Sequence, residues 1–387
     1  MSVRVLHVFS TFAPGGPQVR TARLLGELDP DWRHSLLALD GNYEARTLLP
    51  ASLEVELLLA PPKAGSARTT RALAGLLRRL RPELLLTYNW GAVDALLASL
   101  VVRPRARIHH EDGFRPDELA GFKRRRIWLR RLLLPRCQAV IVPSFTLEEI
   151  ARERWRLAPA LLRRIPNGLC VQDFPRGDRN PARRAELGIP REALLIGSVG
   201  HLRAEKNPVR LIEAFAGLAP DAHLLVLGAG PELPALQRAV HERRLASRVH
   251  LVGHRAQPQA DYRALDVFAL SSDTEQMPVA LLEAMATALP VVSTDVGDVR
   301  RILPTEQAPF VVALQGADTA GALSRALSRL GQDRDLRDRL GAANRRRVED
   351  EYSFAAMAQA YRECYEHALA GSLPAPARRA GSGTASA

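Results

Sequence analysis

Short apolar runs alternate with amphipathic stretches along the whole chain. In the first half, apolar runs typical of strands cover 3–9, 34–39, 84–88, 106–109 and 138–142. Apolar positions recur at helical spacing between them, over 18–28, 67–80 and 91–101. Strands that alternate with helices favour parallel sheets whose faces are covered by the helices. The pattern therefore predicts an α/β fold.

A second series of the same kind begins at Leu194-Leu195-Ile196-Gly197-Ser198-Val199-Gly200. Its further strands are predicted at 223–227, 249–252, 267–270, 290–293 and 310–313. A polar stretch rich in Pro, Gly, Arg and Asp, 172–192, separates the two series and is expected to be an interdomain linker. Two tandem series predict two Rossmann-like domains facing across a cleft, with ligands at the carboxyl ends of the strands.

Composition is compatible with two domains. The chain has 387 residues, of which 47% are apolar, enough for two cores. It contains no run of eighteen uncharged apolar residues, so no transmembrane helix is expected, and its first residues resemble a strand more than a signal peptide. Three widely spaced cysteines favour a reduced, cytoplasmic protein without a disulfide framework or a zinc site.

The net charge of +12 raises nucleic acid as a partner. Arginine carries nearly all of the excess, and the three lysines are Lys63, Lys123 and Lys206. Arginines scattered over amphipathic helices favour solvated surfaces, and we therefore expect no nucleic-acid partner.

The segment 271–294 carries the strongest chemical signal. A strand ends near Leu270, a polar loop follows, and Pro278 stands where a first helical residue is expected. The helix, through about Ala288, is apolar nearly all round yet contains Glu283. A buried carboxylate needs a partner, either an arginine or the hydroxyls of a bound ribose. Glu275 precedes the helix, where free backbone amides favour anions. The alternative is a structural Glu–Arg pair with Glu275 on the surface.

Two glutamates with seven residues between them, on a loop that enters a helix followed by A-L-P-V-V, resemble the signature of the family-4 retaining glycosyltransferases (glycosyl transferase group 1) of GT-B fold. In that family the first glutamate contacts the donor sugar and the second binds the ribose hydroxyls. The resemblance assigns these roles to Glu275 and Glu283. Many members have Gly-Phe after the first glutamate, whereas this chain has Gln276 and Met277, whose backbone amides can still contact the donor.

The resemblance also implies a domain organisation. Residues 1–171 form an acceptor-side domain, to which a helix at 355–370 returns. The linker is 172–192, and 193–354 bind the nucleotide sugar. The small, polar tail, 371–387, is expected to be disordered.

Further motifs extend the resemblance over most of the chain. Gly15 and Gly16, in S-T-F-A-P-G-G-P-Q, match the family's first glycine-rich loop, where the backbone approaches a phosphate or sugar. Lys206, in V-G-H-L-R-A-E-K-N, matches a lysine at the pyrophosphate. The family's arginine falls at His201, so either Arg203 or a protonated His201 would replace it.

Other strand-end loops of the second domain resemble walls of the nucleotide pocket. They contain Gly228 and Gly230, then His254 in the segment whose backbone usually meets the base, and finally Asp295-Val296-Gly297. Ile165-Pro166-Asn167-Gly168 resembles the family's structural segment at the crossing between domains.

In the first domain, Arg107-Ile108-His109-His110-Glu111-Asp112-Gly113-Phe114 ends a predicted strand. The resemblance places a donor-sugar-binding histidine at His109, with His110 as the fallback, and Glu111 or Asp112 could orient an acceptor hydroxyl. The same letters could form a metal site, but no second ligand cluster accompanies them. The D-x-D at 333–335 lies in a charged helical stretch and is interpreted as a solvated face.

Basic residues alternate with Ile, Trp and Leu over 122–134. Such a helix can lie on an anionic membrane with Trp128 near the headgroups, which would suit a lipid-linked acceptor. An ordinary amphipathic helix with an arginine-rich outer face is an equal alternative.

The expected function is transfer of a hexose-like sugar from a nucleotide diphosphate sugar to an acceptor hydroxyl, with retention, in glycan or lipid-linked saccharide assembly. His109, Glu275 and Lys206 are the expected catalytic residues, and no metal or cofactor is required. The expected location is cytoplasmic, with peripheral attachment to the inner face of the membrane. The alternatives are an epimerase or phosphorylase of the same fold, and a non-catalytic protein that binds a nucleotide sugar or nucleic acid.

Overall fold

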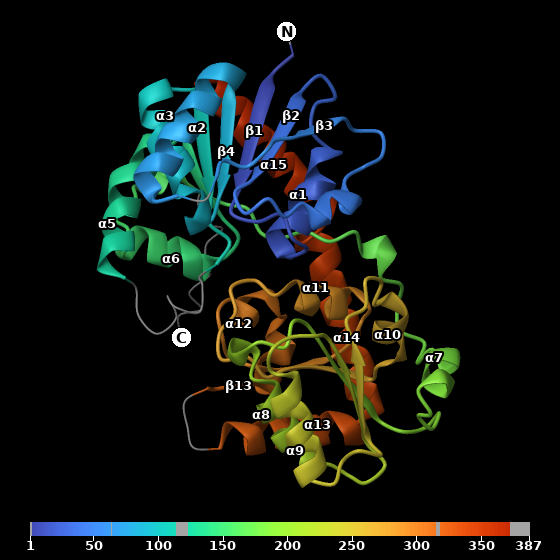
Figure 1. The fold of residues 1–387 in the computed structure, drawn as a ribbon. Helices are drawn as coiled ribbons and strands as arrows, with labels where there is room; N and C mark the ends of the chain where they lie inside the picture. The colour runs from blue at the N-terminus through green and yellow to red at the C-terminus, as the bar shows by residue number, and fades with distance from the viewer. Residues whose placement is uncertain (1, 63, 114–122, 315–317, 372–387) are drawn as a thin grey trace, which may run out of the picture. The chain divides into compact units, whose positions relative to one another are not determined.

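The computed structural model describes residues 2–62, 64–113, 123–314 and 318–371. The chain divides into two compact units, Met1–Pro166 with Ala358–Ala387, and Asn167–Met357. In the described residues each unit holds one parallel sheet covered by helices (Figure 1). The predicted α/β class is confirmed in both.

The described part of the first unit contains a seven-stranded parallel sheet in the order β3-β2-β1-β4-β5-β6-β7. Edge strands β3 and β7 were not predicted, because three residues are too few to show a period of two. The strands are β1 Arg4–Phe9, β2 Arg33–Ala38, β3 Val55–Leu57, β4 Leu84–Tyr88, β5 Ala106–His110, β6 Ala139–Val142 and β7 Leu162–Arg164.

Helices cover both faces of this sheet. Helices α2 and α3 lie side by side over the face that carries Leu6, Val8 and Leu85 (Figure 1). On the opposite face, His110 meets Tyr365 of α15. The helices are α1 Gly16–Leu25, α2 Ser66–Leu80, α3 Val93–Val102, α5 Arg124–Leu133, α6 Phe145–Glu153 and α15 Phe354–Ala370, the last belonging to this unit from Ala358 onward.

The second unit has a six-stranded parallel sheet within its described residues, in the order β10-β9-β8-β11-β12-β13. Strand order reverses at β8, which lies between β9 and β11, and ligands of such sheets bind at the carboxyl ends beside that switch point. The strands are β8 Leu195–Val199, β9 His223–Leu227, β10 Val249–Gly253, β11 Val267–Leu270, β12 Val291–Thr294 and β13 Val311–Val312.

Two buried apolar clusters fill the two faces of the second sheet. One joins α10, α11 and α14, and the other joins α8, α9 and α13. Asp333, from the D-x-D segment, caps α14 by accepting a hydrogen bond from the backbone of Leu336 at 2.8 Å. The helices are α7 Pro181–Glu186, α8 Pro208–Ala216, α9 Leu233–Glu242, α10 Gln259–Ala264, α11 Val279–Ala286, α12 Val299–Ile302, α13 Thr319–Gln332 and α14 Arg334–Glu351.

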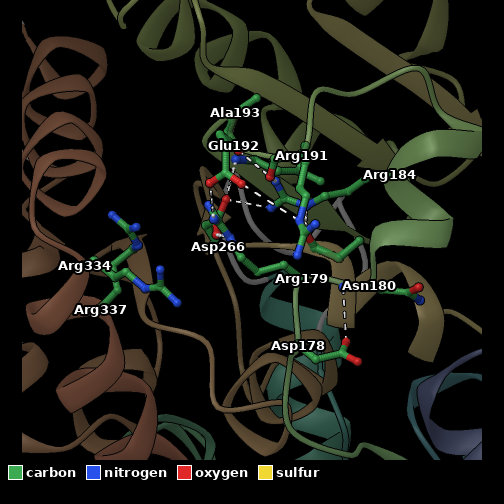
Figure 2. A network of polar contacts seen from close by, with 12 residues as sticks. Asp178, Arg179, Asn180, Arg184, Arg191, Glu192, Ala193, Asp266, Arg334 and Arg337 are labelled. Carbon is green, nitrogen blue, oxygen red and sulfur yellow. Dashed lines mark hydrogen bonds and ion pairs between the residues drawn. The ribbon is translucent and has the colours of Figure 1, made fainter.

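Residues 172–192, expected as a linker, lie inside the second unit. Asp266, directly before β11, accepts from Arg184 of α7 at 2.7 Å and from Arg179 at 2.6 Å (Figure 2). Burial alone would raise the pKa of Asp266. The two guanidiniums and the backbone amide of Leu195 have the larger opposite effect, so the pKa lies below its ordinary value. The polar composition of this segment thus anchors it to the sheet. The unit boundary falls after Pro166, and residues 372–387 of the expected tail lie outside the described residues.

Candidate functional site

The second unit brings most of the predicted site residues to one edge of its sheet. Loops after β8, β9, β10, β11 and β12 all begin at the carboxyl ends of the strands, because the strands are parallel. The loop after β8 carries Lys206, and the loop after β11 carries Glu275. Residues far apart in the sequence therefore become neighbours here.

Lys206 and Glu275 contact each other directly. The Lys206 Nζ atom lies 2.6 Å from Glu275 Oε1 and 2.6 Å from Oε2. The carboxylate is buried, with 6% of its side chain exposed, whereas 32% of the lysine side chain is exposed. Ser272 Oγ donates to Glu275 Oε1 at 2.7 Å. An accessible ammonium is thus held beside a buried carboxylate.

The loops that carry this pair are tied together by backbone contacts. Ser271 Oγ donates to the carbonyls of Lys206 and Asn207 at 3.2 and 2.9 Å, and the amide of Asp273 donates to the carbonyl of Glu205. A Cβ at Gly297, after β12, would lie 2.0 Å from the carbonyl oxygen of Glu275. Glycine is required there because another backbone packs against it.

Glu283 lies on α11, the helix that follows the Glu275 loop, and its side chain is half-buried. Its Oε2 accepts a 2.8 Å hydrogen bond from the hydroxyl of Tyr262 on α10. Tyr262 is fully buried, and burial, followed by the charge of Glu283, raises the pKa of its hydroxyl. The hydroxyl therefore donates at neutral pH. The sequence predicted a partner for Glu283 but did not identify this tyrosine.

Gln276 and Met277 follow Glu275 into α11. Gln276 is half-buried, whereas Met277 is buried in the core of the unit. The side-chain amide of Asn167 donates to the Met277 carbonyl at 3.3 Å, and the Asn167 backbone amide lies 3.1 Å from the Met277 sulfur. Met277 therefore fixes the start of the second unit against the loop, and its carbonyl is already engaged.

The remaining predicted nucleotide-binding residues lie around the end of β9. His201 and His254, after β8 and β10, are exposed, and their rings are parallel. Gly228 and Gly230 lie close to neighbouring backbone. A Cβ on Gly228 would lie 1.9 Å from the carbonyl oxygen of Gly200, and a Cβ on Gly230 would lie 2.3 Å from the carbonyl oxygen of Leu202.

Arg203 is 55% exposed at its side chain and lies 3.8 Å from Glu205. Its guanidinium is accessible to an anion in the described structure. Burial, followed by the charges of Arg203 and His254, lowers the pKa of His201. Neutral His201 is a weaker candidate for phosphate than Arg203.

A hollow of about 550 Å³ lies beside the Glu275 loop. Asp295, Val296 and Gly297 line it, together with Asp273, Thr274, Ala313 and Leu314, and the assignment of 295–297 to a nucleotide pocket stays a prediction. The acidic side chains of Asp273 and Asp295 in its lining disfavour a bare phosphate there.

In the first unit, Gly15 and Gly16 begin α1. Gly15 is the extended N-cap residue, and a Cβ on Gly16 would meet nothing within 4 Å. The open first turn presents free backbone amides, the property that favours an anionic ligand.

His109 is fully buried at the end of β5. Its Nδ1 lies 2.8 Å from Thr87 Oγ1, and its Nε2 lies 3.3 Å from Glu111 Oε2. Arg130 of α5 binds both oxygens of Glu111, at 3.1 and 2.9 Å, and lies over the rings of Trp90 and Trp155. Both ring nitrogens of His109 are therefore engaged within the unit.

The three residues that follow His109, namely His110, Glu111 and Asp112, also have side-chain partners within the first unit. Burial, followed by the charge of Arg20, lowers the pKa of His110, whose Nε2 lies 2.9 Å from the Tyr365 hydroxyl. Burial raises the pKa of Glu111, but Arg130 and then His109 bring it down to about 2. Asp112 pairs with Arg20 of α1 at 2.5 Å. The described residues contain no group of three or more His, Cys, Asp and Glu side chains arranged to hold a metal ion.

Sequence reasoning missed two residues of this site, Tyr262 and Ser272. Ser272 lies three residues before Glu275 in S-S-D-T-E and was available as a loop hydroxyl. Tyr262 lies on another helix, and only the packing of α10 against α11 brings it near Glu283.

Two parallel α/β units, with a lysine and two glutamates gathered at the carboxyl edge of the second, define the class of GT-B glycosyltransferases. The family profile "Glycosyl transferases group 1" matches residues 180–347, and "Glycosyl transferase 4-like domain" matches 15–168. The chain belongs to the group 1, family-4 glycosyltransferases of GT-B fold. The resemblance drawn from Glu275 and Glu283 is thereby confirmed at the level of family and fold.

Relatives and solved structures agree with this placement. The phosphatidylinositol N-acetylglucosaminyltransferase GPI3 subunit of Saccharomyces cerevisiae (strain YJM789) is 28% identical over 56% of this chain and 49% of its own length. The UDP-Gal:alpha-D-GlcNAc-diphosphoundecaprenol alpha-1,3-galactosyltransferase of Escherichia coli is 29% identical over 49% of this chain and 50% of its own. The chain thus spans about half the length of these curated relatives.

A structure of Anabaena HepE in complex with UDP and glucose has a TM-score of 0.79 and 18% identity, and covers 93% of this chain and 98% of its own. At that identity the likeness shows the fold. Across the described residues, no helix combines the length and the apolar character needed to cross a membrane.

Proposed function

We propose that this glycosyltransferase transfers a sugar from a nucleotide diphosphate sugar to an acceptor hydroxyl, with retention at the anomeric carbon. The contact of Lys206 with both oxygens of Glu275 carries the proposal. A cation that suits a diphosphate lies beside a carboxylate that suits sugar hydroxyls, and both lie at the kind of strand ends where nucleotides bind in such sheets, which supports the proposal.

The donor would divide its contacts among these groups. Lys206 and Arg203 would neutralise the diphosphate as the bond from the anomeric carbon to its oxygen breaks. Glu275 would accept hydrogen bonds from the sugar, and Glu283, oriented by Tyr262, would accept them from the ribose. The acceptor oxygen would bond to the anomeric carbon on the same face, and its proton would pass to the departing phosphate oxygen. We assign no separate base, no metal and no cofactor to this reaction.

We assign His109 a positioning role. Its two ring nitrogens already contact Thr87 and Glu111, so binding a sugar would cost one of these buried contacts. The network joining it to Arg130 would hold the end of β5, and acceptor recognition would fall to neighbouring first-unit loops. Residues 114–122, part of that expected region, lie outside the described residues.

The test is a donor panel. We expect one of UDP-, GDP- or ADP-sugars to raise the melting temperature, because ligands of the folded state stabilise it, and to be hydrolysed or transferred. Nuclear magnetic resonance of the product should show an unchanged anomeric configuration, and the activity should survive EDTA.

Glu275→Gln is the matched test variant, because it keeps the size of the side chain and removes its charge. We expect it to lower kcat/KM by at least about 100-fold, the magnitude typical of a lost transition-state contact. A product of inverted configuration would contradict retention. Absence of transfer across the whole panel, with nucleotide binding intact, would leave a non-catalytic binding protein.

We also propose that α5 attaches the protein peripherally to an anionic membrane on the cytoplasmic side. Trp128 is 62% exposed on this helix, and Arg124, Arg125 and Arg131 are exposed beside it. Its inner side is anchored by Arg130, which is buried on Glu111. Two relatives have names that include a lipid, phosphatidylinositol or diphosphoundecaprenol, and a membrane-bound acceptor would suit this surface.

Sedimentation with vesicles tests this attachment. Vesicles with 30% anionic lipid should bind the protein, and neutral vesicles should not. Arg124→Gln with Arg125→Gln should weaken binding by about 1 kcal/mol for each charge, and Trp128→Ala should weaken it further. Arg325→Gln, in the exposed part of α13, is the control. Equal binding to neutral vesicles would refute the electrostatic attachment.

A further inference from the structure

His201 and His254 present two parallel imidazole rings at the carboxyl edge of the second sheet. Their ring centroids lie 6.4 Å apart, and their planes differ by 7°. Both side chains are exposed. They come from strands that are not neighbours, since β9 lies between β8 and β10.

The backbone explains how two such strands present rings to each other. Strand β9 is followed by Gly228-Ala229-Gly230, in which the methyl group of Ala229 is the one side chain. The amide of Gly228 donates to the carbonyl of Gly253 at 2.8 Å, and the amide of Leu202 donates to the carbonyl of Ala229 at 3.0 Å. The three loops are therefore fastened together by backbone hydrogen bonds.

The backbone beside each ring is also constrained. The backbone of Ala229 lies near the His201 ring and partly offsets the lowering of its pKa by burial. His254 directly follows Gly253, whose φ of 74° turns the chain at the end of β10. The backbone from which each ring projects is thus held in place, and the two rings lie nearly parallel.

The separation suits a third planar ring. Stacked bases in DNA lie about 3.4 Å apart, so a ring placed between two others needs roughly twice that distance. The ring centroids of His201 and His254 lie 6.4 Å apart, slightly less than this value, so the two rings have to separate a little to admit a base. Aromatic side chains bind bases of any sequence in this way, since every base has a π-face.

We propose that the base of the nucleotide enters between His201 and His254 and stacks on both imidazoles. The inference rests on the proposed function, because it takes the ligand to be a nucleotide. Its content is specific: His201 recognises the base rather than the phosphates, and recognition acts on the face of the base. The site then tolerates different bases, and the larger face of a purine binds more tightly than that of a pyrimidine.

Calorimetric titration of UDP and ADP into the whole protein tests the proposal, with inorganic pyrophosphate as the probe that lacks a base. His201→Ala and His254→Ala should each weaken UDP and ADP binding by about 5- to 150-fold, corresponding to about 1–3 kcal/mol of stacking. Pyrophosphate binding should stay unchanged. His201→Phe and His254→Phe should bind both nucleotides within about threefold of the unmodified protein.

His241→Ala is the control, since His241 is an exposed histidine at the end of α9. Circular dichroism of each variant checks folding. If His201→Ala weakens pyrophosphate as much as UDP and phenylalanine does not restore binding, His201 is a phosphate ligand and the proposal fails. It also fails if EDTA abolishes the effect of the histidines, which would indicate a bound metal ion.

The two hypotheses fail separately. If the protein transfers sugar and both alanine variants bind UDP normally, only base stacking is rejected. If the unmodified protein neither binds nucleotides nor transfers sugar across the donor panel, the proposed function is rejected, and base stacking with it.

Discussion

Glu275 has a buried carboxylate whose charge is balanced by one partly exposed lysine. Burial of a carboxylate without a counter-charge is costly, and Ser272 supplies one neutral hydrogen bond only. The pair therefore has a structural effect that exists before any ligand binds. A ligand that attracts Lys206 toward its phosphates must leave Glu275 with replacement donors, which sugar hydroxyls can provide.

The first prediction concerns this coupling. Lys206→Ala should lower the free energy of unfolding by about 1–3 kcal/mol, because it leaves the Glu275 carboxylate without its cation. Lys206→Ala combined with Glu275→Gln should recover part of that loss. Urea unfolding of the two single variants and the double variant gives the coupling energy. Strictly additive effects would show that the two side chains do not interact in solution.

The second prediction concerns Tyr262, which orients Glu283. Tyr262→Phe removes one hydroxyl and should weaken UDP binding by about 5- to 10-fold, the value of one hydrogen bond. The loss should be smaller for 2′-deoxy-UDP, which offers Glu283 one hydroxyl fewer. Tyr43→Phe, which removes a first-unit hydroxyl bonded near Ala38, is the control and should leave both affinities unchanged. An equal loss for both nucleotides would indicate a structural role alone.

At the scale of single elements, α14 packs closely against the loop that follows α11. A Cβ on Gly341 would lie 2.0 Å from the carbonyl oxygen of Ala288, a residue that itself has a φ of 61°. The contact is with a backbone atom, so a Cβ on Gly341 would require the backbone of Gly341 or of Ala288 to move. Gly341 is therefore present because of a close approach between segments, in a helix where alanine would otherwise be favoured.

The third prediction compares two glycines inside helices. Gly341→Ala should destabilise the protein by about 1–3 kcal/mol, because overpacking outweighs the gain in helix propensity. Gly75→Ala, in α2, should stabilise it by about 0.5–1 kcal/mol, since a Cβ there meets nothing within 4 Å. Thermal unfolding of both variants measures the difference. Stabilisation by both substitutions would refute the packing argument.

Elements with a clear period were predictable from the sequence, and side-chain partners across elements were not. The strands at 223–227 and 267–270 coincide with the structure because buried parallel strands are continuous apolar runs. The segment 172–192 was misinterpreted because the charges of Arg179 and Arg184 suggest solvent, whereas Asp266, some eighty residues later, binds them. Glu283 indicated a need for a partner, but only packing could supply Tyr262.

At the scale of the whole molecule, the two units differ in how they hold histidine. The first unit buries His7, His34 and His110 in contact with one another or with tyrosines of β4 and α15. Burial lowers the pKa of all three, that of His34 to about 4. The second unit has His201, His223 and His250 with lowered pKa values, but these are exposed or half-buried.

The fourth prediction is that acid destabilises the first unit before the second. A histidine whose pKa is lower in the folded state binds fewer protons there than in the unfolded chain. Stability is therefore complete above the ordinary value of 6.5 and is lost as the pH falls toward the folded value. Each buried histidine should cost up to about 2 kcal/mol at pH 5. Glu111, whose pKa is lowered from 4.5 to about 2, loses its stabilisation mainly below pH 4.5 and therefore adds little to the change between pH 7 and pH 5.

Tryptophan fluorescence can isolate this effect, because Trp32, Trp90, Trp128 and Trp155, all four tryptophans of the chain, lie in the first unit. Urea midpoints measured by fluorescence should fall between pH 7 and pH 5 by more than the second transition seen by circular dichroism. His34→Phe removes one of the three titrating groups and should reduce the pH dependence by about a third. A fluorescence midpoint that does not change with pH would mean that the buried histidines are protonated in the folded state, and that their contacts are rearranged in solution.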